Sequence, residues 1–131
     1  MGEINVLAVL LGALAFFAVG FVWYGMLFRK LWQRESGIVD PPVGGRVALT
    51  MGLTFAFELL IALMLGHLIA RTTTQPHVMM MMAVGFAVGI MVPALGINYL
   101  HQRKSGLLFT IDAGHFVVGM AAMGAVFVAM L

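Results

Sequence analysis

The sequence of 131 residues contains no cysteine and few charged residues. Without cysteine the chain has no disulfide, no thiolate metal site and no cysteine nucleophile. Charged residues make up 9% and apolar residues 63% of the sequence, whereas a soluble domain is typically about 25% charged and about 45–50% apolar. Together with a mean hydropathy of +1.08, this composition excludes a soluble globular domain, a disordered chain and a coiled coil. It indicates an integral membrane protein whose surroundings are the lipid bilayer.

Motifs for catalysis and cofactor binding are also missing. The sequence has no G-x-S-x-G, H-E-x-x-H, P-loop or dinucleotide-binding pattern, so we expect no enzyme activity. His67 and His115 are expected near opposite faces of the membrane, which argues against a shared haem. His77 with Met79–Met82 could attract copper, but consecutive helical residues point in different directions. We therefore predict no metal and no cofactor, and a net charge of only +2 predicts no nucleic-acid partner.

Four long apolar runs dominate the chain. Each exceeds the ~20 residues that cross a hydrocarbon core of ~30 Å. Inside that core a segment must satisfy its own backbone hydrogen bonds, so each run should be an α-helix. The sequence therefore predicts an all-α protein, a four-helix transmembrane bundle that forms a single domain over residues 1–131, with spans at residues 4–28, 47–70, 78–100 and 107–131.

Basic residues lie mainly in two of the loops. The first run is preceded by no lysine or arginine and followed by several, which is the pattern of an uncleaved signal anchor. The loop over residues 29–46 and the loop after the third span hold six basic residues, and the opposite side holds only Arg71. Basic loops face the cytoplasm. We therefore predict a multi-pass protein of a bacterial inner membrane, with both termini outside and these residues inside: Arg29, Lys30, Arg34, Arg46, Arg103 and Lys104.

Aromatic residues cluster at the predicted cytoplasmic end of the first span. Trp23, Tyr24 and Trp32 are expected to anchor this end in the headgroup region, where aromatic rings are favoured. Residues 29–35 are predicted to form a short interfacial helix. An irregular linker should follow, because glycine and proline recur there at Gly37, Pro41, Pro42, Gly44 and Gly45.

Small residues predict where the helices pack. Membrane helices associate through close approach at glycine and alanine, because lipid tails are as apolar as the side chains. Four short helices leave much of this surface free in a monomer, which favours a homo-oligomer. Pro93 should kink the third span. The candidate packing positions are Gly12, Gly20, Gly52, Gly85, Gly89, Ala121 and Ala125.

Four polar residues inside the predicted spans are candidates for a functional network. Ionisable groups in hydrocarbon are costly and are functional candidates. Glu58 is expected about 16 Å deep and His115 about 12 Å deep in helices that both start on the cytoplasmic side, so we predict that they pair. Asp112 and Asn98 should form a second pair nearer the cytoplasm.

This polar network permits two interpretations. As a proton or cation relay, it would make the protein a small channel or proton-coupled transporter. As a buried clamp that fixes helix register, it would suit a non-catalytic membrane subunit or scaffold that binds partner membrane proteins. Polar groups around a wet cavity would favour transport, and dry satisfied packing would favour the scaffold.

Two stretches of the sequence resemble a known family. They are residues 5–8 leading to Gly20–Tyr24 and Leu27–Trp32, and residues 108–115 followed by Met123-Gly124-Ala125. Both are similar to the small bacterial membrane-protein family catalogued as domain of unknown function 1761. The resemblance implies four membrane helices and no particular activity. The family often has Asn-Ala-Gly-Tyr where this chain has residues 112–115, so the acid–histidine pair is not expected throughout the family.

Overall fold

The structure is a computed structural model that describes residues 2–40, 43–72 and 75–131, and the elements in these residues are all helical. Four helices are long and apolar enough to cross a membrane, which confirms the predicted all-α architecture. One span combines α1 and η1, and another combines α4, η2 and α5. In chain order the elements are α1 (Val6–Val22), the π-helical turn η1 (Trp23–Leu27), α2 (Arg29–Ser36), α3 (Gly45–Thr72), α4 (Pro76–Phe86), the π-helical turn η2 (Ala87–Met91), α5 (Val92–His101) and α6 (Gly106–Ala129).

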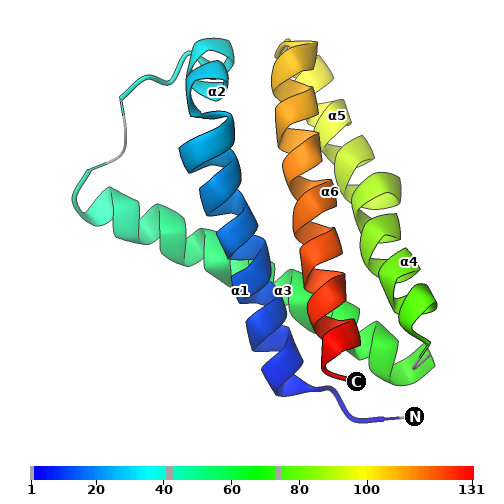
Figure 1. The fold of residues 1–131 in the computed structure, drawn as a ribbon. Helices are drawn as coiled ribbons and strands as arrows, with labels where there is room; N and C mark the ends of the chain where they lie inside the picture. Colours follow the sequence, from blue (N-terminus) through cyan, green and yellow to red (C-terminus); the bar gives the residue numbers. More distant parts are fainter. Residues whose placement is uncertain (1, 41–42, 73–74) are drawn as a thin grey trace.

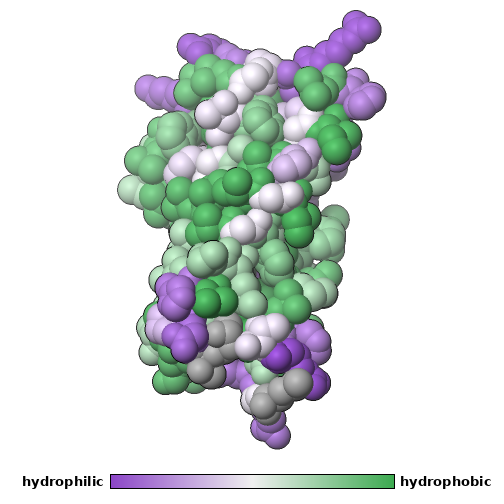
Figure 2. Space-filling view, turned by 90° about the vertical axis from the view of Figure 1, so that its right-hand side faces the viewer, coloured by the Kyte–Doolittle hydropathy of each residue, from purple (hydrophilic) through white to green (hydrophobic). Residues whose placement is uncertain are grey.

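The surface has an apolar middle and polar ends. Figure 2 shows apolar residues over the central part of the face in view, with hydrophilic residues gathered above and below it. Large apolar side chains such as Phe21, Phe57 and Ile90 are mostly exposed. This distribution fits a chain surrounded by lipid, where apolar side chains need not be covered by protein.

Local residue choices set the helix ends. The side chain of Asn5 accepts a hydrogen bond from the amide of Ala8 at the start of α1, and Ser105 does the same for Leu108 at the start of α6. Gly37 ends α2 in the left-handed region at φ 75°, where glycine meets no steric penalty. The short helix predicted over residues 29–35 is therefore present as α2, and Pro41 and Pro42 of the predicted linker lie outside the described residues.

Helix α6 is the centre of the bundle. It lies beside α1 on one side and beside α4 and α5 on the other (Figure 1). Nine of its residues are buried, against four in the longer α3. Both termini lie at the end of the bundle opposite α2 (Figure 1).

Helix α3 takes a different course from the other spans. It crosses the bundle obliquely, and its first half extends beyond α1 (Figure 1). All residues from 43 to 53 are exposed, and the buried residues of α3 begin at Glu58. The part of α3 after residue 53 therefore makes the packing contacts, chiefly with α1.

Glycines of α6 allow the tightest helix contacts. A Cβ at Gly119 would lie 2.8 Å from the ring of Phe16 in α1, and a Cβ at Gly124 would lie 2.7 Å from the Cβ of Ala83 in α4. Of the predicted packing positions, Gly12 approaches Met123 and Gly20 approaches His115. These contacts place α1 and α4 close to α6, as expected for membrane helices.

The other predicted packing positions are not used within the described part of the chain. A Cβ added at Gly52, Gly85 or Gly89 would have no described side chain of another helix within 4 Å, and Ala125 is exposed. Ala121 is half-buried. Helical spacing identifies a small-residue face but not the neighbour it meets, and a role of these positions between chains stays a prediction.

The third span is interrupted as Pro93 predicts. The π-helical turn η2 ends at Met91, and α5 begins at Val92 with Pro93 in its first turn. Proline lacks the amide that would bond one turn back, and a π-helical turn is one way in which a helix accommodates such a break.

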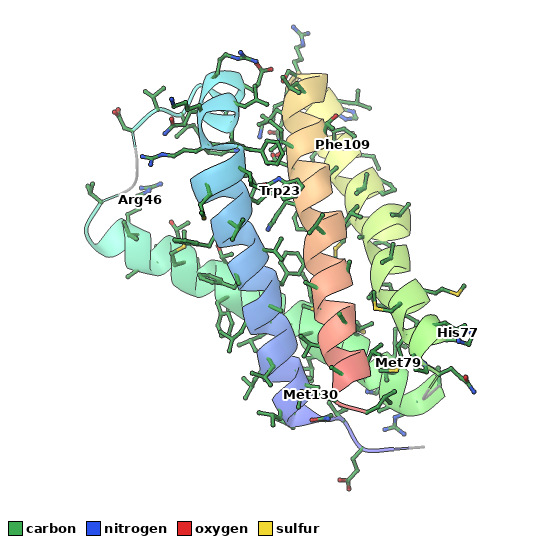
Figure 3. The ribbon with its side chains drawn as sticks, viewed as in Figure 1. Trp23, Arg46, His77, Met79, Phe109 and Met130 are labelled. Atoms are coloured by element: carbon green, nitrogen blue, oxygen red, sulfur yellow. The ribbon has the colours of Figure 1, made fainter. Side chains whose placement is uncertain are left out.

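Five of the seven basic residues gather at one end. These five belong to α2 or to the turn between α5 and α6, which lie together at the upper end in Figure 1, whereas Arg71 lies at the end of α3. Arg46 was predicted to join the five, but it belongs to the protruding start of α3 and lies lower than α2 in Figure 3. The oblique course of α3 causes this difference. The five are Arg29, Lys30, Arg34, Arg103 and Lys104.

Substituting Gly119 by alanine should destabilise the bundle. The new methyl group would overlap the ring of Phe16, and overpacking of this kind costs about 1–3 kcal/mol. Gly85→Ala is the matched control, because that position is open and alanine is the better helix former. Unfolding of the purified variants in detergent measures both effects; equal stability of the two variants would contradict this close α1–α6 interface.

Candidate functional site

A buried carboxylate joins three helices near the α2 end of the bundle. Asp112 of α6 is 7% exposed. Its Oδ1 accepts a hydrogen bond of 2.5 Å from the hydroxyl of Tyr24, and its Oδ2 accepts one from the hydroxyl of Tyr99. Tyr24 belongs to η1 and Tyr99 to α5. We call these three residues the Asp112 cluster.

The π-helical turn η1 brings two consecutive aromatic side chains onto α6. Trp23 Nε1 donates to the carbonyl of Ile111 at 2.9 Å, beside the bond from Tyr24 to Asp112. The ring of Trp23 lies between α1 and α6 (Figure 3), where Gly114 leaves room for it: a Cβ at that position would be 2.8 Å from the indole. Such π-helical turns within α-helices are frequent at functional sites.

These contacts revise the predicted role of the aromatic residues. Trp23 and Tyr24 are half-buried and bond to α6 instead of pointing only to headgroups. Trp32 of α2 packs edge-on against the ring of Tyr24, with 6.0 Å between centroids. The short helix α2 therefore covers the Asp112 cluster from the loop side.

His115 lies one turn beyond Asp112 along α6. Its ring packs against Tyr24, Phe16 and Phe116 with centroid distances of 4.9, 5.2 and 5.2 Å. Its Nε2 is buried and has no hydrogen-bond partner among the described residues. This nitrogen faces Gly20 of α1, where an added Cβ would lie 3.0 Å from it.

Glu58 is buried at a separate place. It is 5% exposed, and its Oε2 has no hydrogen-bond partner in the described part of the chain. It lies one turn after Phe55, whose ring packs edge-on against Phe17 of α1, so the carboxyl group belongs to the face of α3 that meets α1. Thirteen residues of α3 precede it and fourteen follow it, which places it about 20 Å along the helix from either end.

The two predicted pairs do not form. Glu58 and His115 each keep a buried atom without a partner among the described residues, so they do not bond to each other. Asn98 is exposed and makes no hydrogen bond with Asp112; the next residue, Tyr99, bonds there instead. The depth argument assumed parallel helices, whereas α3 crosses obliquely and packs on α1 (Figure 1).

Outside the span, polar contacts tie α2 and the α5–α6 turn to the same region. Ser105 Oγ donates to Glu35 Oε1 at 2.8 Å, and Lys104 Nζ lies 4.5 Å from the centroid of the Tyr99 ring. The hydrogen bond from Ser105 lowers the pKa of Glu35, with a further contribution from Arg34. Within the described residues, no three His, Asp or Glu side chains come close enough together to hold a metal ion.

Removing either phenol should destabilise the protein. Tyr24→Phe or Tyr99→Phe leaves the buried carboxylate of Asp112 short of one donor, and hydrogen bonds to charged groups contribute about 1.5–3 kcal/mol. In an Asp112→Asn background the same substitutions should cost less, because the acceptor is no longer an anion. A double-mutant cycle of unfolding free energies measures this difference, and additive effects would show that the two bonds contribute little.

Acid should weaken the contact between α2 and α6. Because the pKa of Glu35 is lowered from 4.5 in the folded protein, its contribution is fully present above pH 4.5 and is lost as pH falls through the lower, folded pKa. The effect should be small, since the side chain is partly exposed and water screens its interactions. Comparing unfolding of the natural protein and Glu35→Gln between pH 7 and acid tests it: only the natural protein should show this loss.

A model of one protein family matches residues 7–128, and its description is Protein of unknown function (DUF1761). Searches of curated proteins and of solved structures found no match. The matched range covers all but one residue at the outer end of the first and last long helices, and it contains the Asp112 cluster, His115 and Glu58. It agrees with the resemblance seen in the sequence, and because it spans nearly the whole sequence, the chain belongs to the family described as Protein of unknown function (DUF1761).

Proposed function

We propose that this protein is a small proton-conducting channel or proton-coupled transporter of a bacterial inner membrane, and that Glu58 is its central titrating group. The observation behind the proposal is that Glu58 is buried at the middle of a membrane-length helix with an oxygen that lacks a partner in the described chain. The proposal assigns no enzymatic reaction.

The cost of this arrangement supports a functional role. A polar group taken out of water without a hydrogen bond costs several kcal/mol, roughly 2–7 by transfer measurements. Apolar side chains at this position would pack against α1 without that cost. Acidic residues inside membrane spans commonly mark ion pathways and proton relays.

The Asp112 cluster and His115 supply groups for a proton path from the α2 end. Carboxyl, phenol and imidazole groups can each hold and pass a proton. His115 packs on Tyr24, which bonds to Asp112, so the three groups form a connected series pointing into the span. In the proposed path, Glu58 receives protons from this series through water or a conformational change, since it does not contact His115 through a hydrogen bond.

The distribution of charge supports an orientation. Five basic residues at the α2 end favour the cytoplasmic side for that end, and the termini would then face outward. The opposite end of the bundle has fewer basic residues, with Arg71 in the last turn of α3. The proton path would therefore open to the cytoplasm beside α2.

A homo-oligomer is part of the proposal. The first half of α3 and the open positions Gly52, Gly85 and Gly89 leave surfaces on which a second copy could approach closely. A membrane-protein partner could use the same surfaces.

The second candidate function is a non-catalytic membrane subunit or scaffold. One observation favours it: both carboxylate oxygens of Asp112 are already bonded to tyrosines, as in a clamp that fixes helix register. Under this alternative Glu58 would have no part in ion movement, which makes its substitution the test that separates the two.

Glu58→Gln should abolish proton movement. Purified protein in liposomes that contain a pH-sensitive dye is driven by a potassium diffusion potential, and the natural protein should acidify the lumen faster than empty liposomes. Glutamine has a similar shape but cannot exchange protons, so the variant should fall to the rate of empty liposomes. Glu35→Gln, a carboxyl change outside the spans, is the matched control and should keep the natural rate.

Size-exclusion chromatography of each variant verifies that assembly is intact. Unchanged proton entry in Glu58→Gln would exclude Glu58 as the titrating group. No entry with the natural protein would exclude a proton channel, and if no coupled solute flux is then driven by a pH gradient, the scaffold function is supported.

A further inference from the structure

A cavity of about 380 Å³ opens at the end of the bundle that holds the termini. It lies where the segment before α1, the end of α3, the start of α4 and the end of α6 meet. Met79 and Met130, which line it, are labelled at the lower end of Figure 3. Its size falls in the range of small-molecule sites, about 300–1,000 Å³.

The inner wall of the cavity is apolar. Gly66 and Ile69 of α3, Met79 of α4 and Phe127 of α6 contribute to it. Met79 is 1% exposed and Phe127 is 4% exposed, so this wall belongs to the packed core. An apolar group would be favoured there.

The rim of the same cavity holds one acid and one base. Glu3 and Arg71 both line it, and neither forms an ion pair among the described residues, where the pair found is Arg34 with Glu35 at the other end. Because Glu3 and Arg71 do not pair with each other, the carboxylate can bind a cationic group and the guanidinium an anionic group of one ligand.

Backbone contacts hold this rim together. The amide of Gly2 donates to the carbonyl of Ala70 at 3.0 Å, which fixes the first residues beside the end of α3. The side-chain amide of Asn5 donates to the carbonyl of Met130 at 3.3 Å, which joins them to the end of α6. Glu3 and Arg71 are therefore both carried by anchored backbone.

We infer that this cavity binds a zwitterionic amphiphile: a molecule with an ammonium group, an anionic group and an apolar part. The ammonium group donates hydrogen bonds to Glu3, the phosphate or carboxylate accepts from the guanidinium of Arg71, and the apolar part lies against Met79 and Phe127. Two sources have this chemistry. One is an aminophospholipid from the surrounding bilayer, and the other is a free apolar amino acid. The inference is independent of the proposed proton path, because it uses none of the same residues.

The test uses delipidated protein in detergent and native mass spectrometry. Short-chain phosphatidylethanolamine is compared with phosphatidylcholine, whose quaternary ammonium has no N–H donor, and with phosphatidylglycerol, which has no cation. In parallel, binding of leucine is compared with binding of leucinamide, which lacks the carboxylate. At least tenfold tighter binding of phosphatidylethanolamine than of the other two lipids supports the lipid source. A tenfold preference for leucine over leucinamide supports the amino-acid source.

Variants distinguish this cavity from other surfaces. Glu3→Gln and Arg71→Gln should each weaken the preferred probe at least tenfold, and Ile69→Trp should block it by filling the inner wall. Arg29→Gln, a charge change at the opposite end, is the matched control and should bind normally. Circular dichroism verifies that each variant is folded. Equal binding of the three lipids without a leucine preference, or normal binding by Arg71→Gln, would overturn the inference.

Discussion

The bundle depends on one carboxylate that is shared between two phenols. Asp112 lies in α6, and its two oxygens bond to tyrosines that come from the first and third membrane spans. In lipid, where burial of apolar surface does not hold helices together, bonds of this kind fix how far each helix slides and turns against its neighbours. The indole of Trp23 adds a third bond at the same level, so α1 and α6 are held at one defined register.

The number and position of the spans could be predicted from the sequence because hydrocarbon thickness sets helix length. Arg29–Ser36 was also recognisable as a helix of its own. Which faces meet was not predictable, since it depends on crossing angles that hydropathy does not encode. The predicted pairing of Glu58 with His115 was therefore wrong. The role of Tyr99 was not predicted, although a tyrosine hydroxyl at the end of an apolar span indicates a hydrogen-bond acceptor nearby.

The buried polar groups divide into satisfied and unsatisfied ones, and His115 brings the two kinds side by side at Tyr24. The carboxylate of Asp112 has donors for both oxygens, whereas Glu58 and the Nε2 of His115 lack a partner within the described residues. A bonded group contributes to stability, while an unbonded one detracts from it and is free to exchange a proton. This division explains why stability and the proposed proton movement can be tested with different substitutions in so small a protein.

The oblique course of α3 has a consequence for the membrane around it. Its 28 residues extend about 42 Å, whereas a typical hydrocarbon layer is about 30 Å thick. Tilt is the usual way for such a helix to match the layer. Because residues 43–53 are exposed, the start of α3 can change inclination while α1 and α6 stay fixed. A single helix would thus adapt the protein to bilayers of unequal thickness.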